Sequence, residues 1–267
     1  MSKIKFKRKY LSFPYLLFLI FFVFLPLLLI VYYAMTDANG NFSVDNFVKF
    51  FTNKNKIGLL SVSILIGAVN TIICLLIGYP VAMLLTKNKN SKNKVSIMIL
   101  LFIMPMWINF VLRTAATRDL LFWINLDGGT YPYLATMIGM VYNYLPFTIL
   151  PLYSTMLKMD RSLIDASYDL GANKVQTFIK THIPLTMPGI ISAAMMVFMP
   201  TMSSFVISDV MGERKIQLIG NSIQFNFDFM RWNEGSFIAL VMLIIIGISM
   251  FLTRKGEKEE NVRGGLW

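Results

Sequence analysis

Long apolar blocks restrict the fold of this chain more than any other feature of its sequence. A helix crosses the hydrocarbon core of a bilayer with about 20 apolar residues, and only helices and closed barrels satisfy their backbone polar groups there. Six such blocks occur, over residues 11–35, 58–85, 95–116, 133–157, 187–208 and 236–252. The sequence therefore predicts an all-α integral membrane protein, a single domain over residues 1–267 with six transmembrane helices.

The composition argues against soluble enzymes. Of the 267 residues, 56% are apolar and 15% are charged, whereas soluble domains carry about 25% charged residues. The segments between the blocks are short and leave no room for a soluble catalytic domain of ordinary size. One cysteine and one histidine cannot build a metal cluster or a clustered catalytic set, and the phosphate-binding pattern Gly-x4-Gly-Lys-Ser/Thr does not occur. We expect no enzymatic activity, no metal and no cofactor.

The positions of the basic residues predict the orientation in the membrane. Of the 25 Lys and Arg residues, 17 fall in segments 1–10, 86–94, 158–182 and 253–267, and 7 fall in segments 36–57, 117–132 and 209–235. Because basic residues in short loops stay on the cytoplasmic side, we expect both termini to be cytoplasmic. The net charge of +11 then follows from topology. It predicts contact with lipid and does not require nucleic acid.

The segment between the fourth and fifth blocks carries signals for two short helices. Gly171 lies between them, where a left-handed turn would end the first helix. We expect the second helix over Lys174–Lys180. The capping residues that begin the two helices are Asp160 or Ser162 for the first and Asn173 for the second. The two prolines expected to stop the second helix and start the fifth span are Pro184 and Pro188.

This segment resembles the cytoplasmic Glu-Ala-Ala loop of permease subunits of ABC importers of the six-helix type. In that family a glycine follows the acidic residue by six positions, and a proline follows the glycine by thirteen. Asp165, Gly171 and Pro184 have this spacing, Ala166 keeps the first alanine, and Ser167 departs from the second. The resemblance implies the MetI-like fold of type I importers. It also implies that loop 158–184 couples to a separate ATPase through these five residues.

Further stretches resemble the B-type permeases of spermidine/putrescine importers. They lie at residues 105–114, 145–153, 166–172 and 198–223, although the usual second glycine after Gly212 is Glu213 here. The resemblance implies a polyamine permease of a bacterial cell membrane, with ATP hydrolysis in a partner chain. Its implied partners are cytoplasmic ATP-binding subunits, a second homologous permease and an extracytoplasmic polyamine-binding protein. A permease for another small solute is the nearest alternative, followed by a secondary transporter.

A polyamine needs carboxylates for its ammonium groups and aromatic faces for cation–π contacts. Asp209, at the predicted outer end of the fifth span, is the first candidate for contact with the solute. Further candidates with acidic, amide or aromatic side chains are Glu213, Asp228, Trp232, Trp107, Asn109, Tyr142 and Tyr144. For the aromatic residues, an interfacial belt is the alternative. Arg113 falls within the predicted third span, where a cation needs a partner or nearby water; the alternative is that it marks the outer end of that helix, with Asp119 as its partner.

Overall fold

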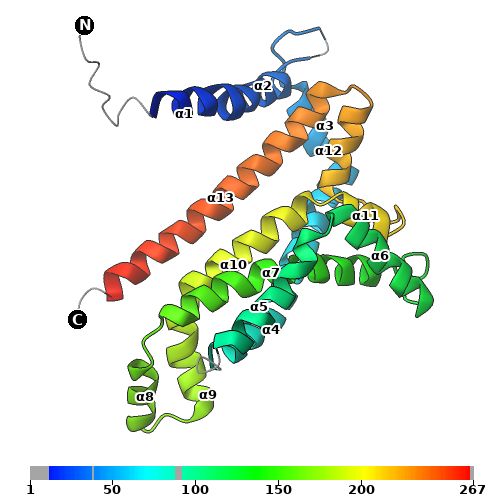
Figure 1. The fold of residues 1–267 in the computed structure, drawn as a ribbon. Coiled ribbons are helices and arrows are strands. Elements are labelled where there is room, and N and C mark those ends of the chain that lie inside the picture. The colour runs from blue at the N-terminus through cyan, green and yellow to red at the C-terminus, as the bar shows by residue number, and fades with distance from the viewer. Residues whose placement is uncertain (1–11, 38, 88–91, 265–267) are drawn as a thin grey trace, which may run out of the picture. The chain divides into compact units, whose positions relative to one another are not determined.

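The computed structural model describes residues 12–37, 39–87 and 92–264, with side chains for 13–37, 39–87 and 95–251 (Figure 1). The basic segment 1–10, residues 88–91 of the Lys/Asn run, and the first residue of the predicted first span lie outside this part of the chain. The described residues form helices and one isolated bridge, between Thr36 and Phe42. The protein is therefore all-α.

The helices follow one another in a simple order. They are α1 (Ser12–Leu19), the π-turn η2 (Ile20–Phe24), α2 (Leu25–Ala34), α3 (Asp45–Thr52), α4 (Lys54–Lys87), α5 (Lys92–Ile103), the 3-10 turn η3 (Met104–Trp107), α6 (Phe110–Trp123), α7 (Pro132–Lys158), α8 (Ser162–Asp169), α9 (Lys174–Thr177), the π-turn η4 (Phe178–His182), α10 (Ile183–Ser203), α11 (Val206–Met211), α12 (Ile219–Asp228) and α13 (Trp232–Gly264).

Five continuous helices in the described part of the chain are long and apolar enough to cross a membrane. They run over Phe13–Ala34, Lys54–Lys87, Pro132–Lys158, Lys174–Ser203 and Trp232–Phe251. A sixth candidate is the pair Val95–Trp107 and Phe110–Trp123, which is bent by 99° at its break. The number of spans is therefore five, or six if the bent pair counts as one. The number predicted from the sequence falls within this range.

Two of the predicted helix boundaries differ from the structure. The third span, predicted over 95–116, is a bent pair of helices, because the chain turns at Pro105 and begins a new helix after Asn109 that runs to Trp123. The fifth predicted span begins at 187, yet the helix runs unbroken from Lys174. Pro184 lacks a backbone donor, but the wider π-turn η4 directly before it lets the helix continue.

The chain divides into two compact units. Unit 1 consists of the described residues of Met1–Ile57 and Ser222–Ile245. Within it, Asn46 on α3 donates from its amide to the carbonyl oxygens of Ala34 and Thr36, each over 3.1 Å. Lys56 and Glu234 form an ion pair of 3.0 Å, which joins α4 to α13. These contacts tie the segment after α2 to α3, and the beginning of α4 to the beginning of α13.

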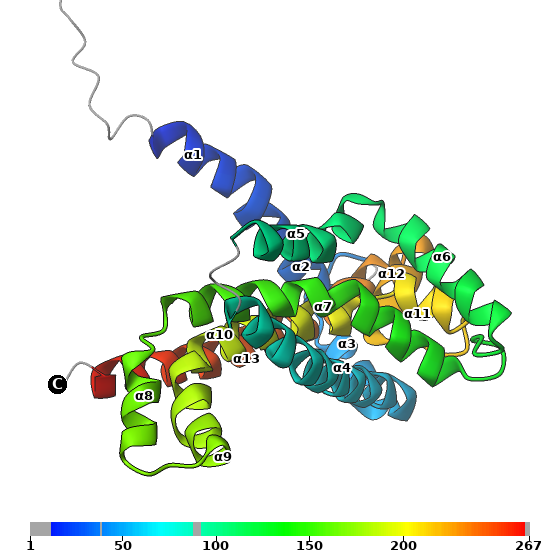
Figure 2. The ribbon, with the colours of Figure 1, turned by 60° about the horizontal axis from the view of Figure 1, so that its bottom comes forward.

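Unit 2 consists of Gly58–Asn221 and the described residues of Ile246–Trp267. Its centre is α7, which packs along α10, and the two views in Figures 1 and 2 both show them side by side. Polar side chains link the apolar helices. Asn70 on α4 donates to the hydroxyl of Thr201 over 2.8 Å, and the Tyr144 hydroxyl donates to the Pro200 carbonyl over 3.2 Å. Such bonds are a common means of joining membrane helices.

Candidate coupling loop and solute site

The loop between α7 and α10 is a pair of short helices. Figure 2 shows α8 beside α9, with the chain turning back between them. The turn is at Gly171, whose φ of +81° is the left-handed conformation that favours glycine. A side chain at Gly171 would meet nothing within 4 Å. The glycine is therefore required for its backbone conformation and not for close packing, as predicted from the sequence.

Local side-chain hydrogen bonds lie at the beginning of both loop helices. Asp160 accepts a hydrogen bond of 3.0 Å from the Ser162 backbone N–H, and these bonds hold the pKa of the Asp160 carboxyl below its usual value. The N-cap of α8 is Arg161 and no side chain caps this helix, so the cap predicted at Asp160 or Ser162 is wrong; the Asp160 carboxylate instead holds the turn that leads into α8. Asn173 caps α9 in a reciprocal capping box with Gln176, over 2.9 and 3.0 Å. The predicted second helix over 174–180 extends further, because α9 runs into η4 and α10.

A single hydroxyl contact joins the two loop helices to each other. The Ser167 hydroxyl lies 3.0 Å from that of Thr177, which is buried. Ser167 is half-buried, whereas the other four residues of the predicted coupling set are exposed. The structure thus gives Ser167 an internal contact. Asp165, Ala166, Gly171 and Pro184 lie where a partner can reach them, and their role in coupling stays a prediction.

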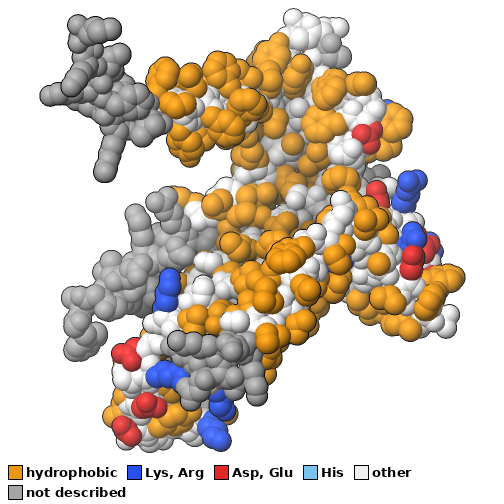
Figure 3. Space-filling model, viewed as in Figure 1, with side chains coloured by type: hydrophobic (Ala, Val, Ile, Leu, Met, Phe, Trp, Pro, Cys, Tyr) orange, Lys and Arg blue, Asp and Glu red, His pale blue; other side chains and the backbone are white. Residues whose placement is uncertain are grey.

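The outer surface of the loop carries apolar side chains among charged ones. The large exposed apolar residues on it are Leu163, Tyr168, Leu170, Val175 and Ile179, with Leu170 89% exposed. Figure 3 shows Lys, Arg, Asp and Glu side chains gathered over the α8–α9 end of unit 2, beyond a largely apolar stretch. A face of this mixed composition fits a protein partner better than the interior of a lipid bilayer.

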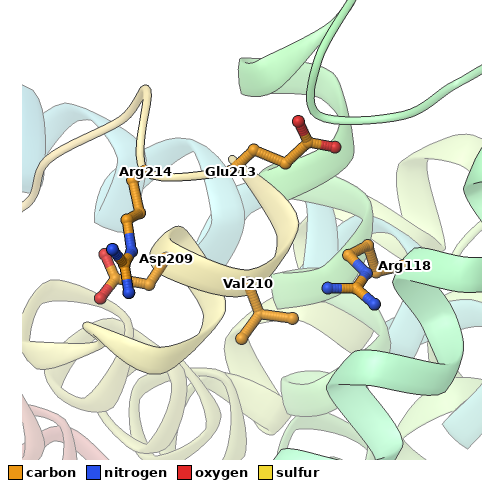
Figure 4. Close-up of a pocket in the computed structure, with 5 residues that line it drawn as sticks. All are labelled: Arg118, Asp209, Val210, Glu213 and Arg214. Atoms are coloured by element: carbon orange, nitrogen blue, oxygen red, sulfur yellow. The ribbon is translucent and has the colours of Figure 1, made fainter.

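At the other charged end of unit 2, α6 and α11 form a small open pocket (Figure 4). It has a volume of about 340 Å³ and is lined by Arg118, Asp209, Val210, Glu213 and Arg214. A neighbouring hollow of about 320 Å³ shares Arg118 and Glu213 and adds Asp119 and Phe122. Figure 4 shows that Arg118 comes from α6, Asp209 from α11, and Glu213 from the turn that follows α11. Two residues predicted to contact the solute are therefore brought together.

Asp209 has a fixed position in this pocket. Its Oδ1 accepts a bond of 2.6 Å from the amide of Asn221, whose own oxygen accepts from the Ser208 hydroxyl and the Leu218 N–H, each over 2.8 Å. Asp209 was expected at the outer end of the fifth span. It lies instead in the separate helix α11, because α10 ends at Ser203. The acid is thus held by side-chain contacts and not by the end of a long helix.

The turn after α11 contains two strained residues. Glu213 and Arg214 have φ values of 47° and 61°, a conformation that costs a residue with a side chain about 1–2 kcal/mol. Glu213 occupies the position where the resemblance led us to expect a second glycine after Gly212. The left-handed φ gives the physical reason for glycine there. The strain also places a carboxylate at the rim of the pocket.

The remaining sequence candidates are not among the residues that line this pocket. Trp107 is 75% exposed, and the Asn109 side chain caps α6 by accepting from the N–H groups of Val111 and Leu112. Tyr144 is buried against α10, while Tyr142 is exposed on α7. In unit 1, Asp228 accepts a bond of 2.9 Å from Gln224, and Trp232 packs on Phe227 with ring centres 5.5 Å apart. Contact of any of these residues with a solute stays a prediction.

Sequence reasoning missed two polar groups of unit 2. Asp119 is not the partner of Arg113; it pairs with Arg118 over 2.8 Å. Arg113 is buried and bonds instead to Asn143, which was not singled out. An asparagine within a long apolar block was the available signal for Asn143. Nothing local to Arg118 indicated that α11 would lie beside it.

Sequence relatives cover most of this chain. It is 33% identical over 264 residues to the spermidine/putrescine transport system permease protein PotB of Haemophilus influenzae, with 91% of each chain covered. It is 34% identical over 264 residues to the protein of that name from Escherichia coli, covering 91% of this chain and 95% of the other. A PotB homolog of Mycoplasma genitalium is 26% identical over 227 residues, covering 81% and 79%. No family model matches the chain.

Solved structures share the fold. A chain of a bacterial alginate ABC transporter, crystallised with its periplasmic protein bound to an alginate pentasaccharide, superimposes with a TM-score of 0.63. The match covers 92% of this chain and 93% of that one at 16% identity. A second structure of an alginate-importing ABC transporter gives a TM-score of 0.64, also at 16% identity, and covers 92% and 94%. These likenesses establish the fold of an ABC transporter permease and nothing more about the solute.

Proposed function

This chain belongs to the PotB family of spermidine/putrescine transport permeases, and we propose that it forms half of the membrane pathway of an ATP-driven polyamine importer. It is a multi-pass membrane protein and a transport subunit, and it works in a complex with ATPase and substrate-binding partners. In the proposed assembly, a second homologous permease completes the pathway. Cytoplasmic ATP-binding subunits drive transport, and an extracytoplasmic polyamine-binding protein delivers the solute to a bacterial cell membrane.

The α8–α9 loop is the observation that carries this proposal. Both ends of the loop lead into long helices: α7 ends at Lys158 just before it, and α9 continues without a break to Ser203. Because α7 packs along α10, a force on the loop reaches both helices at once. The contact between the Ser167 and Thr177 hydroxyls joins α8 to α9. This arrangement would let a separate ATPase move both α7 and α10 by pushing on the α8–α9 loop.

The proposed orientation of the protein in the membrane rests on its basic residues and on the position of the α8–α9 loop. If both termini are cytoplasmic, the α8–α9 loop faces the ATPase and the pocket between α6 and α11 faces outward. An extracytoplasmic protein could then deliver its solute close to Asp209 and Glu213. Their carboxylates are suitable partners for the ammonium groups of a polyamine. The transporter would therefore receive its solute at one end of unit 2 and its driving force at the other.

One observation favours a different solute as the second candidate. The pocket that holds Asp209 and Glu213 also contains Arg118 and Arg214. Guanidinium groups bind carboxylate and phosphate well and repel ammonium groups. A solute with both charges, or an anionic one, would also suit this lining. The family membership favours the polyamine, and a competition assay separates the two.

Uptake of labelled spermidine by the full complex in proteoliposomes tests the proposal. We expect uptake that needs internal ATP and the binding protein, and that unlabelled putrescine or spermidine reduces but inorganic phosphate or sulfate does not. Gly171→Pro should lower uptake by on the order of 100-fold, because proline cannot adopt a φ of +81°. Gly247→Ala is the matched control, since a side chain there meets nothing within 4 Å and φ is ordinary.

The outcomes separate the parts of the proposal. Spermidine uptake that persists without ATP would contradict an ABC importer. Uptake blocked by an anion instead of a polyamine would favour the second candidate. Full activity of Gly171→Pro would remove the loop from the coupling path, whatever the solute.

A further inference from the structure

Arg113 is a buried cation within the broken third span. Its side chain lies in the first turn of α6 and is 7% exposed. A charge at such depth is costly unless it is paired or hydrogen-bonded. Among the side chains that the structure describes, no carboxylate forms an ion pair with Arg113; the two ion pairs found there involve Lys56 and Arg118. Neutral acceptors therefore hold this charge.

Arg113 and its two acceptors come from three segments that meet at the bend. The Arg113 Nη1 donates to the carbonyl oxygen of Pro105 over 2.7 Å, and its Nε donates to Oδ1 of Asn143 over 2.8 Å. Pro105 belongs to η3, before the break, Arg113 belongs to α6, after it, and Asn143 belongs to α7. One guanidinium group thus ties both arms of the 99° bend to the central helix of unit 2.

Two further hydrogen bonds fix the orientation of the Asn143 amide that accepts from Arg113. The Asn143 amide donates to the Gly139 carbonyl over 2.8 Å and to the Thr114 hydroxyl over 3.3 Å. Its oxygen must therefore point at Arg113. The Tyr142 ring covers the guanidinium carbon at 5.7 Å. A planar group with several fixed donors suits this arrangement, whereas a lysine ammonium cannot reach two separate acceptors in the same way.

The bend presents an exposed segment, Met104–Asn109, which we call the elbow. It includes Trp107 and Ile108, which are 75% and 55% exposed. We propose that Arg113 is a positioning residue that holds the elbow in one place against α7 and so presents Trp107 to the solute at a fixed position. The role in transport rests on the proposed function. The role in holding the elbow does not.

A distance measurement tests the positioning role without any solute. Spin labels are placed at Ile108→Cys on the elbow and Tyr133→Cys on α7, both at exposed positions, in a complex whose only other cysteine is the native Cys74. The native Cys74 is buried, and the unmodified chain serves as the labelling control. We expect one narrow distance distribution. Arg113→Gln and Arg113→Lys should broaden or shift it, and Leu120→Ala, at an exposed site on α6, should not.

Transport provides the second readout on the same proteins. We expect the KM for spermidine to rise on the order of tenfold in Arg113→Gln and Arg113→Lys, with a smaller change in maximal rate, because small misplacements of contacting groups weaken binding and catalysis strongly. Rates are normalised to the assembled complex. A role of the charge alone would instead leave Arg113→Lys like the wild type.

The double variant Arg113→Met with Asn143→Leu covers the case in which single variants do not fold. Replacing both partners of a buried polar pair by apolar groups of similar size often preserves stability. We expect this variant to assemble and to show both the altered distances and the raised KM. An unchanged distance distribution in an assembled Arg113 variant would overturn the proposal. A wild-type complex that imports no spermidine would overturn the proposed function and leave the distance result standing.

Discussion

Two elements of unit 2 are built as helix, break and helix, and they are stabilised in opposite ways. In the α8–α9 loop, the break at Gly171 is flanked by the turn at Asp160 and the cap at Asn173, and both of these hydrogen bonds join residues two or three positions apart. At the elbow, the break is held by Arg113 and by Asn143, which is 30 positions away. The loop is therefore stabilised by contacts within itself, whereas the elbow is stabilised by its contact with α7.

This difference indicates where the molecule can move. The loop is exposed, and its internal bonds can stay intact while it moves as a lever. The elbow is tied into the packed centre, where changing one bond leaves another polar group buried without a partner. We therefore expect variants of the elbow to affect stability strongly and variants of the loop to affect it locally. Four predictions test this contrast, from the largest effect to the smallest.

Asn143→Leu should lower the free energy of unfolding by the largest amount. It removes the acceptor of Arg113 Nε and leaves the cation buried with a single partner, Pro105, so the free energy of unfolding should fall by about 3–5 kcal/mol. Unfolding of the purified subunit in mixed micelles with increasing SDS measures this. The double variant with Arg113→Met should recover most of the loss. A loss in the double variant as large as the sum of the two single losses would contradict a coupled pair.

Gly171→Ala should lower the free energy of unfolding by a smaller amount, and its structural effect should stay within the loop. The left-handed φ of +81° costs an alanine about 1–2 kcal/mol, and no clash adds to it, since the added methyl meets nothing within 4 Å. The same unfolding assay measures this effect. Asparagine tolerates the left-handed conformation better than alanine, so Gly171→Asn is the matched control with a smaller loss. Equal losses for the two would argue against the backbone explanation.

Asn173→Ala should loosen only the beginning of α9. Loss of an N-cap costs about 1 kcal/mol, which corresponds to about fivefold faster exchange of the amide hydrogen of Gln176. Hydrogen exchange read out by mass spectrometry measures this change. The elbow amides should be unaffected. Faster exchange that spreads to residues 104–113 would show that the loop and the elbow are not independent.

Asp160 should make the smallest contribution to the stability of the loop. This contribution is recognised by its dependence on pH. The Ser162 N–H lowers the pKa of this exposed carboxyl from its ordinary value of 3.8. The stabilisation is therefore present above that ordinary value and is lost as the pH falls through the lowered pKa of the folded state. Amide protection at Ser162 should follow this course. In Asp160→Asn the protection should no longer change with acid in this way.

The same contrast explains what the sequence could predict. Gly171 and Asn173 act on their immediate neighbours, so the turn and the second cap were predictable. Pro105 lies within the predicted third span, but the size of the bend there depends on Arg113 and Asn143 meeting across two helices. Pro184 was expected to stop a helix, and the π-turn before it was not predictable from local rules.

The candidate solute site was predictable only in part. The acids Asp209 and Glu213 were identified by their chemistry. Their neighbour Arg118 comes from another helix, about ninety positions earlier in the chain, and no local pattern connects them. The fixing of Asp209 by Asn221 likewise depends on how α11 and the beginning of α12 pack. The roles of residues that act through contacts distant in sequence could be found only from the three-dimensional structure.

Cross-linking from Leu170 tests the central claim, that the α8–α9 loop is where the ATPase drives this permease. Leu170 is 89% exposed at the end of the loop, and a photo-reactive amino acid there can be activated in cells that carry the whole complex. Trp123, 81% exposed at the end of α6, is the control for the opposite side. The account predicts an adduct between position 170 and the ATPase and none from position 123. An adduct of position 170 with the extracytoplasmic binding protein, or an ATPase adduct from position 123, would contradict it.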